Sequence, residues 1–295
     1  MRAVVLGAAA GGGFPQWNCR CAVCALAWAK DPRALWRTQS SLAVTADGER
    51  WVVLNASPDL GSQIRATPAL WPRHERHSPI GAIILSSAEI DHVAGLLSVR
   101  ERQPFDLVAL APVLAAIKDN PIFAPVPARR IAATVSEPIA LPGGLTAELF
   151  PVPGKAPLYL EGGDPQLESE AGETAGVRIS AEGRSLVYIP GCAVLTDAVR
   201  AQAERADALF FDGTLFDDDE MIRAGLGEKT GRRMGHMPIS GAGVSLAWLA
   251  ELRVSRKIYI HLNNTNPALI EGSPERLAIE AAGVEVAFDS MEVKL

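Results

Sequence analysis

A strand, a polar loop and the start of a helix follow one another in Ile83-Ile84-Leu85-Ser86-Ser87-Ala88-Glu89-Ile90-Asp91-His92-Val93-Ala94-Gly95-Leu96. The apolar run at its start predicts a buried strand, and polar side chains at the carboxyl end of a strand commonly face a cleft. Asp91 and His92 are adjacent, so the loop must direct both side chains toward a common centre. In the alternative interpretation, Asp91 caps the helix and His92 is a surface neighbour.

Short apolar segments punctuated by turns recur along the chain and predict a fold of two packed sheets with helices outside. Asp47-Gly48 and Glu182-Gly183 are strong hairpin signals. The acidic, glycine-rich stretch 161–176 predicts a solvated loop. No linker divides the chain, so we expect a single domain over residues 1–295 of α/β (α+β) class. Strands are expected at 2–6, 41–46, 51–55, 80–85, 107–110, 145–150, 176–180, 186–189, 208–211, 257–260 and 284–288, and helices at 62–70, 95–101, 112–118, 197–205, 243–252 and 274–282.

Composition excludes several classes of protein. The chain has 295 residues, of which 48% are hydrophobic and 21% charged, so it can bury a substantial core and is not expected to be disordered. No apolar run reaches the roughly 18–20 residues that a membrane span needs. A formal net charge of −6 disfavours nucleic acid as a partner. The first residues lack the pattern of a signal peptide, and we expect a cytoplasmic protein.

Three of the four cysteines, Cys19, Cys21 and Cys24, lie within six positions. Disulfides are rare in the cytoplasm, and three thiolates on a tight loop suit a zinc ion. The alternative is a set of free buried cysteines. The fourth ligand stays open between Cys192, Asn264, a water and another nearby side chain.

The five histidines have different surroundings. His74 and His77 lie in a polar segment and are expected at the surface, although their spacing would also let them share a helix face. His261 directly follows an expected strand and precedes an amide-rich run. His236 precedes an apolar helix, and Asp212 ends another strand, where a buried carboxylate needs a partner.

Asp91, His92 and His261 together offer one carboxylate and two imidazoles to a single metal ion. This is the ligand set of mononuclear non-heme Fe(II) oxygenases, in which further coordination positions stay open. Zinc with a bound water would also accept these ligands.

These segments resemble the metallo-β-lactamase superfamily, in which a strand is followed by His-x-His-x-Asp-His and, usually, Gly-Leu. Asp91 and His92 match the end of that motif, and His261 matches the histidine that follows a late strand. Ser87 and Glu89 stand where the motif has its first two histidines.

The resemblance also has two further gaps. Cys192 falls where the family has a bridging aspartate, and no histidine lies between His92 and His236. The resemblance therefore implies that one metal position survives and that the second has lost its ligands, which disfavours two-metal hydrolysis.

Several motifs spread over the whole chain resemble the coenzyme PQQ synthesis protein B family. The resemblance implies an αββα sandwich of two mixed sheets, with a structural zinc on Cys19, Cys21 and Cys24. It further implies a role in making pyrroloquinoline quinone (PQQ) from a ribosomal peptide. The motifs are Gly11-Gly12-Gly13-Phe14-Pro15-Gln16-Trp17-Asn18-Cys19-Arg20-Cys21-Ala22-Val23-Cys24, Leu54-Asn55-Ala56-Ser57-Pro58-Asp59, Asp212-Gly213-Thr214-Leu215, Lys229-Thr230-Gly231 with Gly235-His236, and Ile260-His261-Leu262-Asn263-Asn264-Thr265-Asn266-Pro267.

For this family the resemblance implies an Fe²⁺- and O2-dependent hydroxylase that acts on the tyrosine ring of the excised, cross-linked Glu–Tyr unit. Its partners would be that peptide-derived precursor or PQQ as a small-molecule ligand, together with other pathway proteins. The alternatives are a carrier that transports PQQ or its precursor to the periplasm, a metallo-hydrolase of the same superfamily, and a scaffold for pathway enzymes. Whether the chain forms a homodimer is left open.

Other residues receive supporting roles in this hypothesis. Asp212 and His236 are the acid–base candidates, since an imidazole near its solution pKa shuttles protons at neutral pH. Four basic residues are candidates for binding substrate carboxylates: Arg65, Arg178, Lys229 and Arg232. Side chains expected to orient the ligands or the substrate are Ser87, Glu89, Cys192, Asn263 and Asn264.

Overall fold

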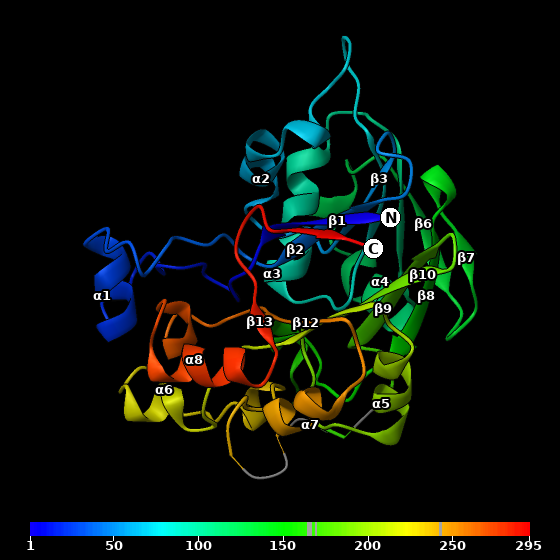
Figure 1. Ribbon diagram of the computed structural model, residues 1–295. Helices are drawn as coiled ribbons and strands as arrows, with labels where there is room; N and C mark the ends of the chain where they lie inside the picture. Colours follow the sequence, from blue (N-terminus) through cyan, green and yellow to red (C-terminus); the bar gives the residue numbers. More distant parts are fainter. Residues whose placement is uncertain (164–166, 169, 242–243) are drawn as a thin grey trace.

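The computed structural model describes residues 1–163, 167–168, 170–241 and 244–295, and two seven-stranded sheets form its centre (Figure 1). The first sheet has the order β14-β1-β2-β3-β4-β5-β6 and the second has the order β13-β12-β11-β10-β9-β8-β7. Both sheets mix parallel and antiparallel pairs. The strands are β1 (Arg2–Gly7), β2 (Ser41–Thr45), β3 (Trp51–Leu54), β4 (Ile80–Ile84), β5 (Phe105–Leu110), β6 (Ala128–Ala133), β7 (Ile139–Ala140), β8 (Thr146–Pro151), β9 (Ala175–Ala181), β10 (Arg184–Ile189), β11 (Ala208–Asp212), β12 (Arg256–Ile260), β13 (Glu285–Val286) and β14 (Glu292–Lys294).

Helices cover the outer face of each sheet, and the expected αββα sandwich is confirmed. In Figure 1, α2, α3 and α4 lie beside the first sheet, α5, α7 and α8 lie beside the second, and α1 projects from the body. The α-helices are α1 (Ala22–Trp28), α2 (Leu60–Ala66), α3 (Ile90–Val93), α4 (Ala111–Lys118), α5 (Asp197–Glu204), α6 (Glu220–Arg223), α7 (Ser245–Glu251) and α8 (Pro274–Ala281). Short 3-10 turns are η1 (Pro68–Leu70), η2 (Ala94–Val99), η3 (Pro121–Phe123), η4 (Pro142–Gly144), η5 (Leu158–Leu160), η6 (Arg232–Met234) and η7 (Pro267–Leu269).

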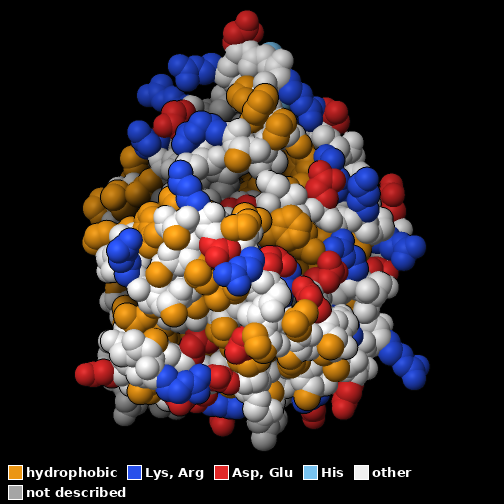
Figure 2. Space-filling model, turned by 60° about the vertical axis from the view of Figure 1, so that its left-hand side comes forward, with side chains coloured by type: hydrophobic (Ala, Val, Ile, Leu, Met, Phe, Trp, Pro, Cys, Tyr) orange, Lys and Arg blue, Asp and Glu red, His pale blue; other side chains and the backbone are white. Residues whose placement is uncertain are grey.

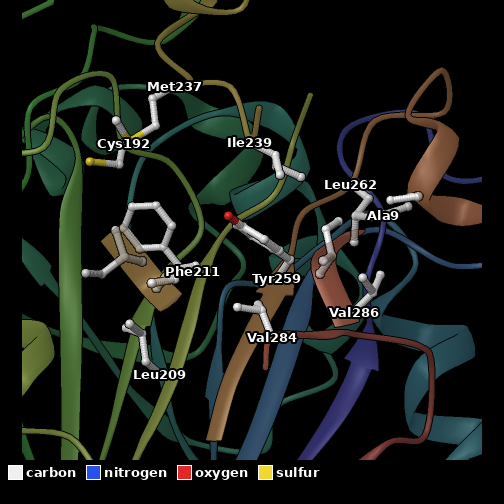
Figure 3. Close-up of a cluster of buried hydrophobic side chains, with 14 of the residues drawn as sticks. Ala9, Cys192, Leu209, Phe211, Met237, Ile239, Tyr259, Leu262, Val284 and Val286 are labelled. Atoms are coloured by element: carbon white, nitrogen blue, oxygen red, sulfur yellow. The ribbon is translucent and has the colours of Figure 1, made fainter. Parts of the chain in front are cut away.

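Strand β11 shows why the central strands are apolar throughout. Successive side chains point to opposite faces of a sheet, and both faces are covered here. Phe210 packs between the sheets, whereas Phe211 packs against the outer helices beside Trp248 of α7. Figure 3 shows Phe211 and Tyr259 among aliphatic side chains of this outer core. Burial on both faces therefore holds the carboxyl end of β11 in place, and Asp212 is the last residue of this strand.

Both predicted hairpins are confirmed. Asp47-Gly48 joins the antiparallel strands β2 and β3, and Glu182-Gly183 joins β9 and β10. Glu182 and Gly183 both have positive φ, at 52° and 77°, as a tight hairpin turn requires.

The structure corrects several boundaries. The helix expected at 62–70 is split before Pro68, because proline lacks the amide hydrogen that would continue it. The helix expected at 95–101 is the 3-10 turn η2, and the α-helical turn α3 precedes it from Ile90. Residue 243, the first of the expected helix 243–252, lies outside the described residues, and α7 begins at Ser245.

The prediction that residues 161–176 form a solvated loop is wrong at both ends of this stretch. Glu161 has a side chain that is only 11% exposed, because three basic side chains surround its carboxylate. Ala175 and Gly176 already belong to β9. Residues 164–166 and 169 of this stretch lie outside the described residues.

Surface and length features bear on the expected partners. In the described part of the chain, no helix combines the length and the apolar character that crossing a bilayer requires. On the face drawn in Figure 2, side chains of both charge signs are interspersed with hydrophobic ones.

Candidate metal centre

Three of the predicted metal ligands converge at the ends of two strands from different sheets. Asp91 and His92 lie on α3, which follows β4 closely, and His261 is the residue directly after β12. Asp91 Oδ2 lies 3.1 Å from His261 Nε2 and 4.0 Å from His92 Nε2. The two imidazole rings meet edge to face with centroids 5.5 Å apart.

The backbone of His261 is strained into this position. Its φ is +63°, in the left-handed region that non-glycine residues rarely adopt. Two hydrogen bonds hold the next residue in place: Leu262 N donates to Ala8 O at 3.0 Å, and Ala10 N donates to Leu262 O at 2.8 Å. Such strain is typical of functional sites and here directs the imidazole toward Asp91.

Two serines orient His92 from behind. Ser87 Oγ lies 2.7 Å and Ser86 Oγ 3.4 Å from Nδ1, so the Nδ1–H donates to these hydroxyls and Nε2 carries the lone pair. Buried Asn55 in turn donates from Nδ2 to Ser86 Oγ at 2.9 Å. Burial lowers the pKa of His92 to about 4, so the ring is neutral at neutral pH, which is the form that binds metals.

A buried carboxylate and a hydroxyl orient His261 and His236. Thr214 Oγ1 donates its only hydrogen to Asp212 Oδ1 at 2.7 Å, and it therefore accepts from His261 Nδ1–H at 2.8 Å. His236 Nδ1–H donates to Asp212 Oδ2 at 2.8 Å, and its ring stacks on His261 at 5.1 Å. Burial alone would lower the pKa of His236, but the charge and hydrogen bond of Asp212 raise it above its usual value.

The donor set fits a metal ion. His261 Nε2 and Asp91 Oδ2 are both acceptors in this arrangement, and two acceptors 3.1 Å apart need a cation between or beside them. His92 Nε2 is buried and finds no hydrogen-bond partner in the part of the chain that the structure describes. Gly11 leaves room next to them, since a Cβ there would lie 3.3 Å from Asp91 Oδ2. Asp91, His92 and His261 could therefore hold one divalent ion.

The residues at the second metal position of the superfamily are engaged elsewhere. Ser87 bonds to His92, and Glu89 accepts from Lys155 Nζ at 2.8 Å. The Cys192 thiol donates to Val194 O, and burial first, then the charge of Asp212, raises its pKa. Cys192 contributes instead through its backbone, whose N–H donates to Asp212 Oδ2 at 2.9 Å.

Asp212, His236 and His261 also bring one potential ligand atom each within 4.8 Å of the others. Its two oxygens already accept four hydrogen bonds, from the amides of Cys192 and Thr214, the Thr214 hydroxyl and His236. These bonds assign Asp212 to positioning the imidazoles.

The metal ligands open into a cavity of about 380 Å³. Of the four basic residues that the sequence suggested for carboxylates, Lys229 lines this cavity. Arg65 donates to Ser62, and Arg178 is buried and donates to Gln202 and to Arg205 O. Sequence reasoning missed Lys155, the positioning role of Thr214 and the apolar wall. That wall is formed by Leu158, Met221 and Met234.

The three clustered cysteines form a second potential metal site. Their sulfur atoms lie within 4.8 Å of one another, on the turn that begins α1. Asn264 Nδ2 lies 3.2 Å from Cys19 Sγ and 3.3 Å from Cys24 Sγ, so this amide, rather than Cys192, adjoins the cluster. Burial and the neighbouring thiols raise the pKa of Cys24 to about 12, which a bound cation would reverse.

The two asparagines predicted to orient ligands or substrate lie at different sites. Asn263 lines the cavity and donates to Thr265 Oγ1 at 2.6 Å, and Thr265 donates to buried Glu220. Asn264 belongs to the cysteine cluster described above. Neither His74 nor His77 is among the described residues that line the cavity or form the cysteine cluster. Their two rings contact each other in an exposed loop, with centroids 4.5 Å apart.

Comparisons with known proteins agree on one family. Residues 50–262 match the family model described as Beta-lactamase superfamily domain. The chain is 53% identical to "Coenzyme PQQ synthesis protein B" of Methylobacterium nodulans, with all of both chains covered. It is 50% identical to a solved structure described as Zn(2+)-bound PqqB from Methylobacterium extorquens, with a TM-score of 0.98 and full coverage of both chains. A diphosphatase from the PhnP family shares the fold, with a TM-score of 0.71 at 20% identity and coverage of 100% of this chain and 97% of that one.

Proposed function

This chain belongs to the coenzyme PQQ synthesis protein B family of the β-lactamase superfamily, and from that premise we propose that it is an iron- and O2-dependent hydroxylase. A role in PQQ biosynthesis follows from the membership. The proposed substrate is the tyrosine ring of the peptide-derived, cross-linked Glu–Tyr unit. The proposed ligands of the iron are Asp91, His92 and His261.

One observation carries the proposal: the donor set is that of a single metal ion with open positions. Two imidazole nitrogens and one carboxylate oxygen converge, and the buried His92 Nε2 has no hydrogen-bond partner among the described residues. Such a set supports Fe(II) oxygenase chemistry, because three protein ligands would leave coordination positions open for substrate and O2. When bound, the iron would supply the activation of O2. A two-metal hydrolase needs a second ion, and Ser87 and Glu89 are engaged by His92 and Lys155.

The chain's own residues prepare the phenol. His236 lines the cavity, and because its Nδ1–H is given to Asp212, its Nε2 is the atom left to take or return a proton. Removing the phenol proton would create an anion, which the cationic site favours. The apolar side chains of Leu158, Met221 and Met234 give the ring a surface to pack against and exclude water.

The test is O2 uptake by the full chain loaded anaerobically with Fe(II), with the cross-linked Glu–Tyr unit as substrate and an external two-electron reductant such as ascorbate. The reductant is needed because one oxygen atom of O2 enters the ring and the other is reduced to water, which consumes two electrons and two protons. We expect uptake and a product heavier by oxygen in the wild type, and loss of both in His261→Ala. His74→Ala removes an exposed imidazole away from the cavity and serves as the matched control.

Other outcomes would replace the proposal. Cleavage of the substrate without O2 uptake would identify a hydrolase. Tight binding of PQQ that His261→Ala leaves unchanged, with no uptake, would identify a carrier.

A further inference from the structure

Two basic side chains of the cavity wall and a third basic side chain beside them surround one carboxylate. Glu161 Oε1 lies 3.0 Å from Lys155 Nζ, and Oε2 lies 3.9 Å from Lys229 Nζ and 3.8 Å from Arg233 Nη1. These cations come from three separate segments of the chain: the loop after β8, the loop after α6, and η6. We call Lys155, Lys229 and Arg233 the basic cradle.

The cradle belongs to the same cavity as the metal ligands. Lys155 and Lys229 both line that cavity. The Lys155 stem packs on Gly235, where a Cβ would lie 3.3 Å from Lys155 Cγ, and Gly235 directly precedes His236. Lys155 is therefore next to the proposed acid–base residue.

Glu89 fixes the ammonium group in this place. Its Oε1 accepts from Lys155 Nζ at 2.8 Å, and its Oε2 accepts from Leu158 N at 3.4 Å. The Tyr159 hydroxyl, which donates to Ala88 O at 2.7 Å, ties the same segment to the loop before α3. The ammonium group is thus held without Glu161, which makes the cradle a pre-organised site.

The charges predict what the cradle binds. Lys155, Lys229 and Arg233 place three positive charges around the Glu161 carboxylate, and Glu89 pairs with Lys155 alone of the three, so the position that Glu161 occupies attracts an anion. Glu161 fills it with a carboxylate whose side chain is 11% exposed, and the cations hold its pKa below its usual range against the opposing effect of burial. Glu161 lies outside any helix or strand, so its departure breaks no regular element.

We propose that the basic cradle is the carboxylate-binding subsite of the substrate and that Glu161 is a built-in carboxylate that the substrate displaces. The inference rests on the proposed function, since it gives the substrate class as a phenol that carries a carboxylate beyond the ring. The metal end of the cavity receives the phenol and the cradle receives the carboxylate. Glu161 then acts as a competitor that only a carboxylate-bearing phenol overcomes.

The test uses binding alone, with the zinc-loaded full chain and two probes. 3-(4-Hydroxyphenyl)propionate and 4-ethylphenol share the ring and spacer and differ in the carboxylate, so the ratio of their dissociation constants isolates the cradle. Since charge-assisted hydrogen bonds are the strong ones, we expect the wild type to prefer the carboxylate probe by on the order of tenfold. Lys229→Met and Arg233→Gln should each reduce this preference several-fold, and Glu161→Gln should increase it.

Arg130→Gln is the matched control, because it removes the same charge from an exposed position on the edge strand β6, and Arg130 is not among the described residues that line the cavity. Equal binding of both probes by the wild type, or an undiminished preference in Lys229→Met and Arg233→Gln, would overturn the cradle. Lys229→Met is informative even if a Lys155 variant folds poorly, because the Lys229 side chain is 44% exposed. A carboxylate preference without O2 uptake by the iron-loaded chain would support the cradle and overturn the hydroxylase. O2 uptake without a carboxylate preference would support the hydroxylase and overturn the cradle.

Discussion

The hydroxyl of Thr214 should determine how tightly the chain holds its active-site metal. This one oxygen donates to Asp212 Oδ1 at 2.7 Å and accepts from His261 Nδ1 at 2.8 Å. Thr214→Val keeps the shape of the buried side chain and removes both bonds. The His261 ring would lose the partner that fixes its orientation and its lone pair on Nε2.

The magnitude follows from these bonds. Asp212 would keep three donors, the amides of Cys192 and Thr214 and the His236 ring, so the carboxylate stays in place. His261 would be left with a buried unsatisfied N–H, which costs about 1–3 kcal/mol. Loss of such a supporting partner typically weakens metal binding about 10–100-fold, and we expect that range for Thr214→Val.

The assay is metal release from the zinc-loaded chain to a chelator of known affinity. Two ions should be released separately, and only the one held by Asp91, His92 and His261 should shift, since the Thr214 hydroxyl orients His261 and no described bond links it to the cysteines. Thr214→Ser, which keeps the hydroxyl, should behave like the wild type. An unshifted release curve for Thr214→Val, or an equal shift for Thr214→Ser, would refute the positioning role.

Two further predictions concern stability and the cysteine cluster. Burial raises the pKa of Glu220 to about 7 in the folded chain, so ionisation favours unfolding as pH rises from about 4.5 to 7. Glu220→Gln should remove up to about 3 kcal/mol of that decline, measured by urea unfolding at several pH values, and parallel pH profiles would contradict it. Cys24→Ala should lower the zinc content by one ion per chain, as elemental analysis would show, and unchanged zinc content would contradict the cluster's role. The variant should also lose the drop in melting temperature that a chelator causes when it removes zinc from this cluster, measured by thermal unfolding with and without chelator.

Burial on two faces made most of the fold predictable from the sequence. The run Ala208-Leu209-Phe210-Phe211 is apolar because helices cover one face of β11 and the other sheet covers the opposite face. Strand β6 was missed for the complementary reason: it lies at a sheet edge, and Arg129 and Arg130 are exposed. Strand β14 was missed because its three residues pair with β1, which lies nearly the whole chain away.

The site was predictable where its residues follow strand ends and unpredictable where they meet only in the fold. Asp91, His92 and His261 each follow a buried strand in the sequence. They could be grouped because all three are residue types that bind metal ions. Thr214 stands two positions after Asp212, and the nearby carboxylate is the signal that could have suggested its role. Lys155 carries no such signal, because its partner Glu89 is 66 positions away.

Glu89 explains why the loss of one metal position and the gain of the basic cradle belong together. Where the superfamily motif has a histidine that can bind a second ion, this chain has a carboxylate, which accepts from Lys155 Nζ at 2.8 Å. An imidazole could bind a metal there, but it could not neutralise a mostly buried ammonium group, whose side chain is 12% exposed. The substitution therefore exchanges a mobile cation that activates water for a fixed one that can only attract anions. This exchange supports our proposal of a site that holds an acidic substrate beside a single metal ion, rather than one built for two-metal hydrolysis.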